Sequence, residues 1–172
     1  MKRDELFNEV KSWLEAEKLG FNPNPDDATF EGGMATTNGL VHVRLCCEES
    51  PAILQVVCAF PLKVPAEKAH EAAVFLHNLN ASLRIGCFYF DPKPRTIIFR
   101  LTMPVRPEVD LGRQFGEAFG TSLGTWDDYL PPLALLLSST EAAMKAFSKF
   151  APEDDAETAT PRLPKSRRME LN

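Results

Sequence analysis

The stretch LVHVRLCCEESPAILQVVCAF, residues 40–60, decides the fold that this sequence predicts. Apolar side chains fall at the odd positions from 41 to 47, and His42, Arg44 and Cys46 fall between them. That period of two is typical of a strand with one buried face. Residues 48–51, EESP, predict a turn, and the nearly continuous apolar run over 52–60 predicts a central strand. The stretch therefore predicts two neighbouring antiparallel strands.

The segments on either side complete a sheet with helices. In chain order we expect a helix over 4–19, a loop over 22–27, a strand over 28–34, a hairpin turn at 38–39, the two strands above, a helix over 65–82 and strands over 84–90 and 95–103. Gly20 is expected to stop the first helix, and Pro65 to open the second. With a helix after the last strand, the order α-β-β-β-α-β-β-α predicts an α+β domain, an antiparallel sheet with helices on one face.

The C-terminal part reads as further helices and then a charged tail. A helical pattern starts at Pro107 and is expected to end at Gly124, and Pro131 and Pro132 are expected to interrupt the next helical turns. A last helix is predicted over 140–150. We therefore expect one domain over 1–150 and a disordered charged tail over 151–172, too polar to offset its ordering entropy.

Composition and charge argue against several classes of protein. The net charge of −5 disfavours binding to nucleic acid or to an anionic membrane, because both need a basic surface. No apolar run approaches the length of a membrane span, and the first residues, MKRDE, lack a signal peptide's apolar core. The expected location is cytoplasmic. The four cysteines show no Cys-x-x-Cys spacing and are expected to be reduced, with a redox or metal role as the minor alternative.

Catalytic and cofactor motifs are weak in this sequence. His70 and His77 stand about 10.5 Å apart along one helix, too far to share a metal without help. There is no phosphate-binding glycine loop, no Gly-x-Ser-x-Gly and no His-Glu-x-x-His. We expect a chain that is not an enzyme, with no catalytic residue, metal site or cofactor.

Three short strings carry a resemblance to a known family. They are FLHNLN at 75–80, GCFYFD at 86–91 and IFR at 98–100. Together they resemble the YbjN-type family, bacterial proteins described as sensory transduction regulators, over about residues 28–137. The resemblance implies the fold of type III secretion chaperones, a regulatory or chaperone-like protein-binding role, and no catalytic residues. The residues themselves suggest structural roles. Asn78 and Asn80 are expected to tolerate a left-handed helix end and to bond nearby backbone groups, with ligand contact as the less favoured alternative, and Gly86 is expected to allow a bulge or a close approach.

A row of glycines is the first candidate interface. Gly112, Gly116, Gly120 and Gly124 recur every four residues in a helical pattern, and each interior glycine costs roughly 1 kcal/mol relative to alanine. Residues at that spacing share a helix face, so the glycines would line a groove. The groove either contacts a second subunit or partner or packs tightly on the chain's own sheet.

The sheet face away from the helices is the second candidate interface. The residues expected there are His42, Arg44, Cys46, Cys87, Tyr89, Ile98 and Arg100. A mixture of aromatic, aliphatic and arginine side chains is typical of interfaces rather than of a plain solvent face. The alternatives are a face covered by the chain's own C-terminal segments and an ordinary wet surface.

These observations predict a protein-binding domain that acts as a chaperone-like or regulatory adaptor. Its candidate interface residues are Arg44, Tyr89, Ile98, Arg100, Gly112, Gly116 and Gly120. The expected partner is another protein, and a homodimer is left open. The alternatives are a dedicated type III secretion effector chaperone, or a small-ligand-binding protein or enzyme.

Overall fold

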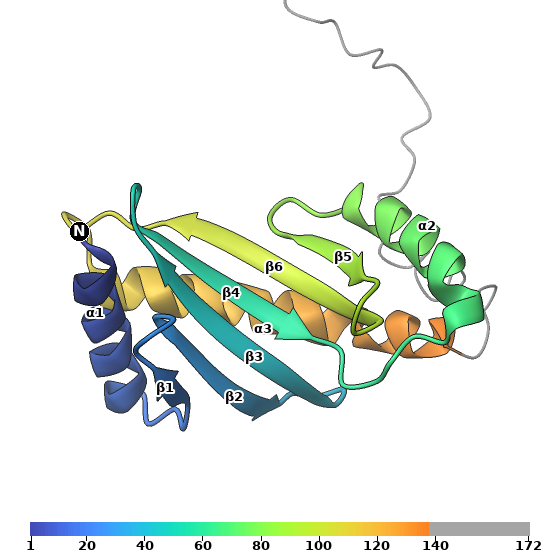
Figure 1. Cartoon of the computed structure of the whole chain (residues 1–172), viewed down its shortest axis with the longest axis horizontal. Coiled ribbons are helices and arrows are strands. Elements are labelled where there is room, and N and C mark those ends of the chain that lie inside the picture. Colours follow the sequence, from blue (N-terminus) through green and yellow to red (C-terminus); the bar gives the residue numbers. More distant parts are fainter. Residues whose placement is uncertain (138–172) are drawn as a thin grey trace, which may run out of the picture.

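The computed structural model describes residues 1–137 of the chain (Figure 1). Its elements are α1 (Arg3–Ala16), β1 (Asn22–Asn24), β2 (Thr29–Ala35), β3 (Leu40–Glu48), β4 (Ile53–Ala59), the 3-10 turn η1 (Ala66–Lys68), α2 (Ala69–Asn80), β5 (Cys87–Asp91), β6 (Thr96–Pro104) and α3 (Leu111–Leu136). The helix expected over 140–150 and the tail over 151–172 lie outside the described residues. The predicted α+β order is confirmed, with β1 as an additional strand.

The strands form one antiparallel sheet in the order β1-β2-β3-β4-β6-β5. In β3 the odd positions are buried while His42 and Arg44 are exposed, as the alternation predicts. β4 lies between β3 and β6, which confirms it as a central strand. On β5 and β6, Phe88 stands opposite Phe99 and Phe90 opposite Ile97.

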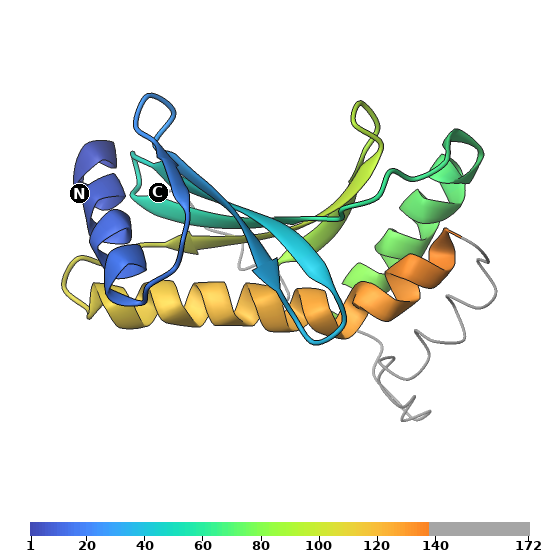
Figure 2. The same ribbon diagram turned by 90° about the horizontal axis from the view of Figure 1, so that it is seen from below.

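The helices build the core against one face of the sheet. Figure 2 shows α3 running along that face, with α1 and α2 at its two ends. Phe7 of α1 stacks on Phe30 of β2 with ring centroids 4.4 Å apart, and Trp126 of α3 is fully buried. Phe88 lies 6.0 Å from Trp126, so β5 contributes to the same core. Burial of these aromatic side chains is the main driving force for the helices to cover this face.

Helix α3 differs from its prediction in three ways. It begins at Leu111 rather than at Pro107, because Asp110 caps it by accepting a hydrogen bond from the Arg113 amide at 2.8 Å. It continues through Gly124 and through both Pro131 and Pro132. Two prolines cost several kcal/mol in a helix interior, but the buried side chains beyond them, among them Leu133, favour continuation. Figure 2 shows the resulting bend in the orange part of α3.

Two predictions in the N-terminal region are also wrong. The first helix ends at Ala16, and Lys18, not Gly20, takes the left-handed conformation that closes it (φ 56°). Residues 22–24 form a strand, β1, although a loop was expected over 22–27. Pro23 is tolerated there because β1 is at the edge of the sheet, where a missing N–H need not cost a ladder hydrogen bond.

The family-motif residues close the other edge of the sheet. Asn80 is the last residue of α2 and its neighbour Ala81 is right-handed, so the left-handed role expected for Asn80 is wrong. Its side chain bonds the backbone of Phe88 in β5, which confirms the expected bonding to backbone groups. Gly86 has φ +74°, and a Cβ there would overlap the ring of Phe99. The close approach expected at Gly86 is confirmed, but it precedes β5 rather than lying inside it.

Candidate functional site: the open face of the sheet

One face of the sheet carries no helix of the described chain. Figure 1 looks onto this face, with the strands in front of α3, and Figure 2 shows the β1–β2 and β5–β6 turns rising on that side. We call it the open face. Its central side chains, from four strands, are His42, Arg44 and Cys46 of β3, Gln55, Val57 and Ala59 of β4, Cys87 and Tyr89 of β5, and Ile98 and Arg100 of β6. The predicted placement of the seven sheet residues on one face is confirmed.

The strand register arranges these side chains in rows across the sheet. One row is Glu31–Arg44–Val57–Arg100–Cys87, and the next is Gly33–His42–Ala59–Ile98–Tyr89. Val57, Ala59 and Ile98 are half-buried and stand at the centre of these rows. Neighbouring strands are about 4.8 Å apart, so the three side chains make one apolar patch flanked by Arg44 and Arg100.

The two arginines of the open face have different partners. Arg44 forms an ion pair with Glu31 on the neighbouring strand, Nε to Oε1 at 2.8 Å. Arg100 donates from Nη2 to the hydroxyl oxygen of Tyr89 at 2.7 Å, and its guanidinium carbon lies 4.7 Å from the centroid of the Tyr89 ring. The hydrogen bond to Tyr89 raises the pKa of Arg100. Arg100 is therefore held in place by an aromatic neighbour.

The four cysteine thiols differ in their exposure to solvent. Cys46 and Cys47 point to opposite sides of β3, as expected, and all four cysteines are free. Burial raises the pKa of Cys47 and of Cys58 to about 12, and burial also raises the pKa of Cys46. Cys87 is exposed on the open face. The buried thiols are therefore poor nucleophiles at neutral pH.

Sequence reasoning missed the contribution of β4 to the open face. Val57 and Ala59 lie at its centre, yet the run over 52–60 has apolar residues on both sides and reveals no face. The alternation of β3 was the available signal, because it places Arg44 on the open face. In the structure Val57 pairs with Arg44 across the strands and therefore lies on the same face. The ion pair of Glu31 was missed for a different reason: β2 has two glycines in its middle, so its sequence also gives no clear alternation of faces.

The glycine row lies apart from the open face. Gly112, Gly116 and Gly120 are in α3, on the other side of the sheet. Apart from the adjoining backbone of α3 itself, a Cβ at Gly116, Gly120 or Gly124 would meet no atom of the described residues within 4 Å, so tight packing on the chain's own sheet is wrong for these three. A Cβ at Gly112 would make ordinary contacts, 3.7 Å from Trp13. The two candidate interfaces are therefore separate surfaces.

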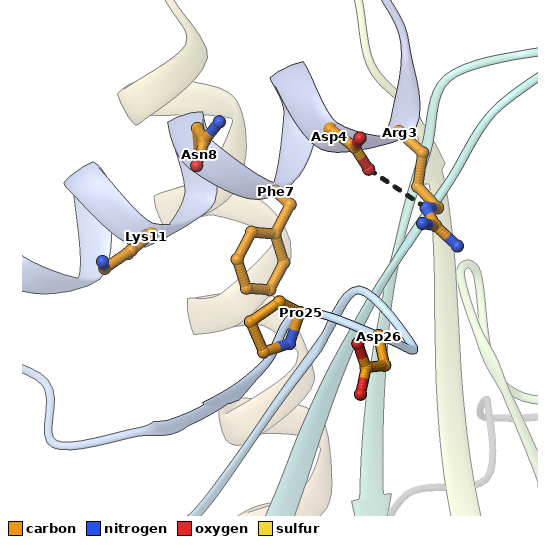
Figure 3. A pocket seen from close by; sticks show the side chains of 7 residues that line it. All are labelled: Arg3, Asp4, Phe7, Asn8, Lys11, Pro25 and Asp26. Atoms are coloured by element: carbon orange, nitrogen blue, oxygen red, sulfur yellow. Dashed lines mark hydrogen bonds and ion pairs between the residues drawn. The ribbon is translucent and has the colours of Figure 1, made fainter.

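A hollow of about 510 Å³ lies between the start of α1 and the β1–β2 turn (Figure 3). Its lining residues are Arg3, Asp4, Phe7, Asn8, Lys11, Pro25 and Asp26. Arg3 and Asp4 pair with each other at 3.3 Å, and the Arg3 amide donates to Glu49. The hollow thus carries charges of both signs without a set of groups that converge on one ligand chemistry.

Residues 1–137 offer neither a metal cluster nor a membrane-spanning helix. That part of the chain contains no group of three or more histidine, cysteine or acidic side chains placed to hold a metal ion. Over the same residues, no helix has the length and apolar character needed to cross a membrane. The open face remains the surface with the most distinctive chemistry.

Comparison with known proteins identifies the family. Residues 7–135 match the family YbjN, described as "Putative bacterial sensory transduction regulator". The chain belongs to the YbjN family. This confirms the resemblance carried by residues 75–80, 86–91 and 98–100, and the match extends it into α1.

A solved structure supports the fold of this YbjN-family chain. The crystal structure of YbjN from E. coli, described as a "putative transcription regulator", has a TM-score of 0.54 at 12% identity and covers 69% of this chain and 83% of that one. The HopA1–SchA chaperone–effector complex contains a chain with a TM-score of 0.44 at 16% identity, covering 73% of this chain and 94% of that one. No curated protein matches the sequence. At such low identity the likeness to YbjN confirms the fold alone.

Proposed function

We propose that this YbjN-family chain is a cytoplasmic, non-enzymatic protein-binding domain, chaperone-like or regulatory, and that its open face contacts the partner. One observation carries the proposal: an apolar patch of Val57, Ala59 and Ile98 lies beside Tyr89 and Arg100 on a sheet face that no helix of residues 1–137 covers. Tyrosine and arginine are enriched among the residues that dominate binding energy at protein interfaces.

The outward-pointing side chains of the sheet favour a binding surface rather than an ordinary solvent-exposed face. A solvated face of an antiparallel sheet normally alternates polar residues outward, and β3 does so at His42 and Arg44. β4 and β6 direct Val57, Ala59 and Ile98 outward in addition to the polar Gln55 and Arg100. Covering these side chains would remove apolar area from water at about 25 cal/mol per Å². The description of the family as regulators agrees with a role in binding.

The test compares what copurifies with the wild-type chain and with two matched variants. Ile98→Glu places a charge in the apolar patch, and Val74→Glu places the same charge at an apolar residue of α2 that is 48% exposed. We expect a polypeptide that copurifies with wild type and Val74→Glu but not with Ile98→Glu. The same polypeptide, once purified, should bind the purified wild-type chain. A polypeptide retained equally by all three would assign binding elsewhere.

Light scattering separates a second copy of the chain from a different partner. If the open face mediates self-association, the wild type has a larger mass than Ile98→Glu at the same concentration. If wild type and Ile98→Glu both have the mass of a monomer, the chain does not self-associate through the open face and the partner is a different protein. Circular dichroism of both proteins checks that the substitution has not altered the fold.

A further inference from the structure

We infer that the partner segment bound by the open face carries a carboxylate that pairs with Arg100, beside an apolar side chain that covers Ile98. The inference rests on the proposed function and specifies the chemistry of the partner. It depends on three observations: Tyr89 orients the Arg100 side chain, the guanidinium has no carboxylate partner among the described residues, and a partner that covers Ile98 would bury this unpaired charge.

Arg100 is oriented before any partner arrives. Its Nη2 donates to the Tyr89 hydroxyl at 2.7 Å while its guanidinium lies 4.7 Å from the Tyr89 ring centroid. A long side chain normally loses rotamer freedom when it binds, and a stacked, hydrogen-bonded arginine has lost part of that freedom already. The remaining N–H groups of the fork are available to an acceptor.

Arg100 has no ion-pair partner among the described residues. The other arginine at the centre of the open face, Arg44, is paired with Glu31 at 2.8 Å. The ion pairs within residues 1–137 include none to Arg100, and the groups that perturb its pKa are Tyr89 and two cysteines rather than a carboxylate. Tyr89 therefore contacts its guanidinium, but no carboxylate of the described residues neutralises its positive charge.

A partner that covers the apolar patch would also cover Arg100. Val57 is the direct cross-strand neighbour of Arg100 on β4, and Ile98 precedes it by two residues on the same side of β6. A buried charge without a counter-ion is strongly unfavourable, whereas an arginine–carboxylate pair with two parallel hydrogen bonds is favourable. A partner that seats on Ile98 must therefore bring an anionic acceptor to Arg100.

The spacing on β6 defines the arrangement on the partner. Ile98 and Arg100 point to the same side of the strand, roughly 6.6 Å apart by the rise of an extended chain. An extended segment running beside them presents side chains at the same interval. An aspartate or glutamate two residues from an apolar side chain matches both positions at once.

The test measures binding of three labelled peptides to the full chain by fluorescence anisotropy. Each probe alternates valine with one other residue, which is glutamate, lysine or serine. We expect the glutamate probe to bind about tenfold or more tightly than the serine probe, as a hydrogen bond to a charged group permits, and the lysine probe to bind most weakly. Arg100→Gln should remove the advantage of glutamate over serine, and Arg100→Lys should retain part of it. Arg113→Gln, a guanidinium exposed on α3, is the matched control and should change nothing.

The outcomes separate this inference from the proposed function. Equal binding of glutamate and serine probes to wild type, or a glutamate advantage that survives Arg100→Gln, overturns the inference. If those probes bind equally and binding is lost in Ile98→Glu, the open face still binds protein and only the carboxylate is wrong. If no probe binds the wild type, the inference and the proposed binding face both fail. Unfolding curves of each variant confirm that the fold is retained.

Discussion

Asn80 at the end of α2 satisfies both backbone polar groups of Phe88 in β5. Its Oδ1 accepts from the Phe88 N–H and its Nδ2 donates to the Phe88 carbonyl, each at 2.7 Å. β5 is an edge strand, so these groups would otherwise face outward. One side-chain amide thus takes the place of a neighbouring strand and closes this part of the edge.

Replacing Asn80 should destabilise the domain. We expect Asn80→Ala to lower the free energy of unfolding by about 1–3 kcal/mol, because it leaves both groups of Phe88 without their partner. Urea denaturation measures the change. Asn78→Ala, at an exposed position of the same helix, is the control and should stay within about 0.5 kcal/mol of wild type. Equal effects of the two substitutions would mean that solvent replaces the Asn80 contacts.

Alanine in the glycine row of α3 should stabilise the chain. Gly116 and Gly120 leave open space for a Cβ among the described residues, so each alanine should add roughly 1 kcal/mol through helix propensity. Gly86→Ala should do the opposite, since φ is +74° there and Phe99 blocks the Cβ. Thermal unfolding and light scattering are measured together. A double variant at 116 and 120 that loses stability or mass would identify the row as a contact surface.

The carboxylate of Asp127 should make stability depend on pH. The Thr36 side chain and the Asn38 backbone N–H, which lies 2.7 Å from Oδ1, lower the pKa of Asp127 below its ordinary 3.8. A lowered folded-state pKa contributes stability that is present above the unfolded pKa and is lost as the pH falls through the folded pKa. We therefore expect wild type to exceed Asp127→Asn in stability near neutral pH.

The difference between wild type and Asp127→Asn should shrink from about pH 5 downward. Denaturation midpoints of both proteins across this range provide the measurement. Asp128→Asn, an exposed neighbour on α3, controls for net charge. A gap between wild type and Asp127→Asn that stays constant into acid would exclude the carboxylate as its cause.

The thiols should react in a fixed order. Cys87 is exposed, whereas the pKa values of Cys47 and Cys58 are raised to about 12 by burial. Iodoacetamide at mildly alkaline pH should therefore label Cys87 first and leave Cys47 and Cys58 unlabelled until the chain unfolds. Peptide mapping by mass spectrometry identifies the sites. In Cys87→Ser the fast phase should disappear, and rapid labelling of Cys58 would contradict the packing of β4.

Local patterns predicted most of the sheet, and contacts distant in sequence decided the rest. The alternation of β3 assigned its two faces because its polar residues fall on one side only. β4 gave no such signal, since Val57 on the open face is as apolar as Val56 in the core. Strand β1 depends on its pairing with β2, which stabilises an extended conformation in a sequence that by itself favours a loop.

The errors in α3 and Asn80 have the same physical origin. Helix α3 passes through Pro131 because Trp126 and Leu133, on either side of it, are fully buried, a gain that propensity does not include. Asn80 marked a helix end correctly, but its hydrogen-bond partner is eight residues away in β5. Propensity describes a residue's neighbours in sequence, and these residues are controlled by their neighbours in space.

The sheet separates two sets of side chains that share the same strands. Val56 and Val57 are adjacent in β4, yet one is fully buried in the core and the other stands on the open face. Substitutions on the open face can therefore accumulate without disturbing the interior that maintains the architecture. The scaffold is thus free to persist while the open face changes, and E. coli YbjN shares this fold at 12% identity.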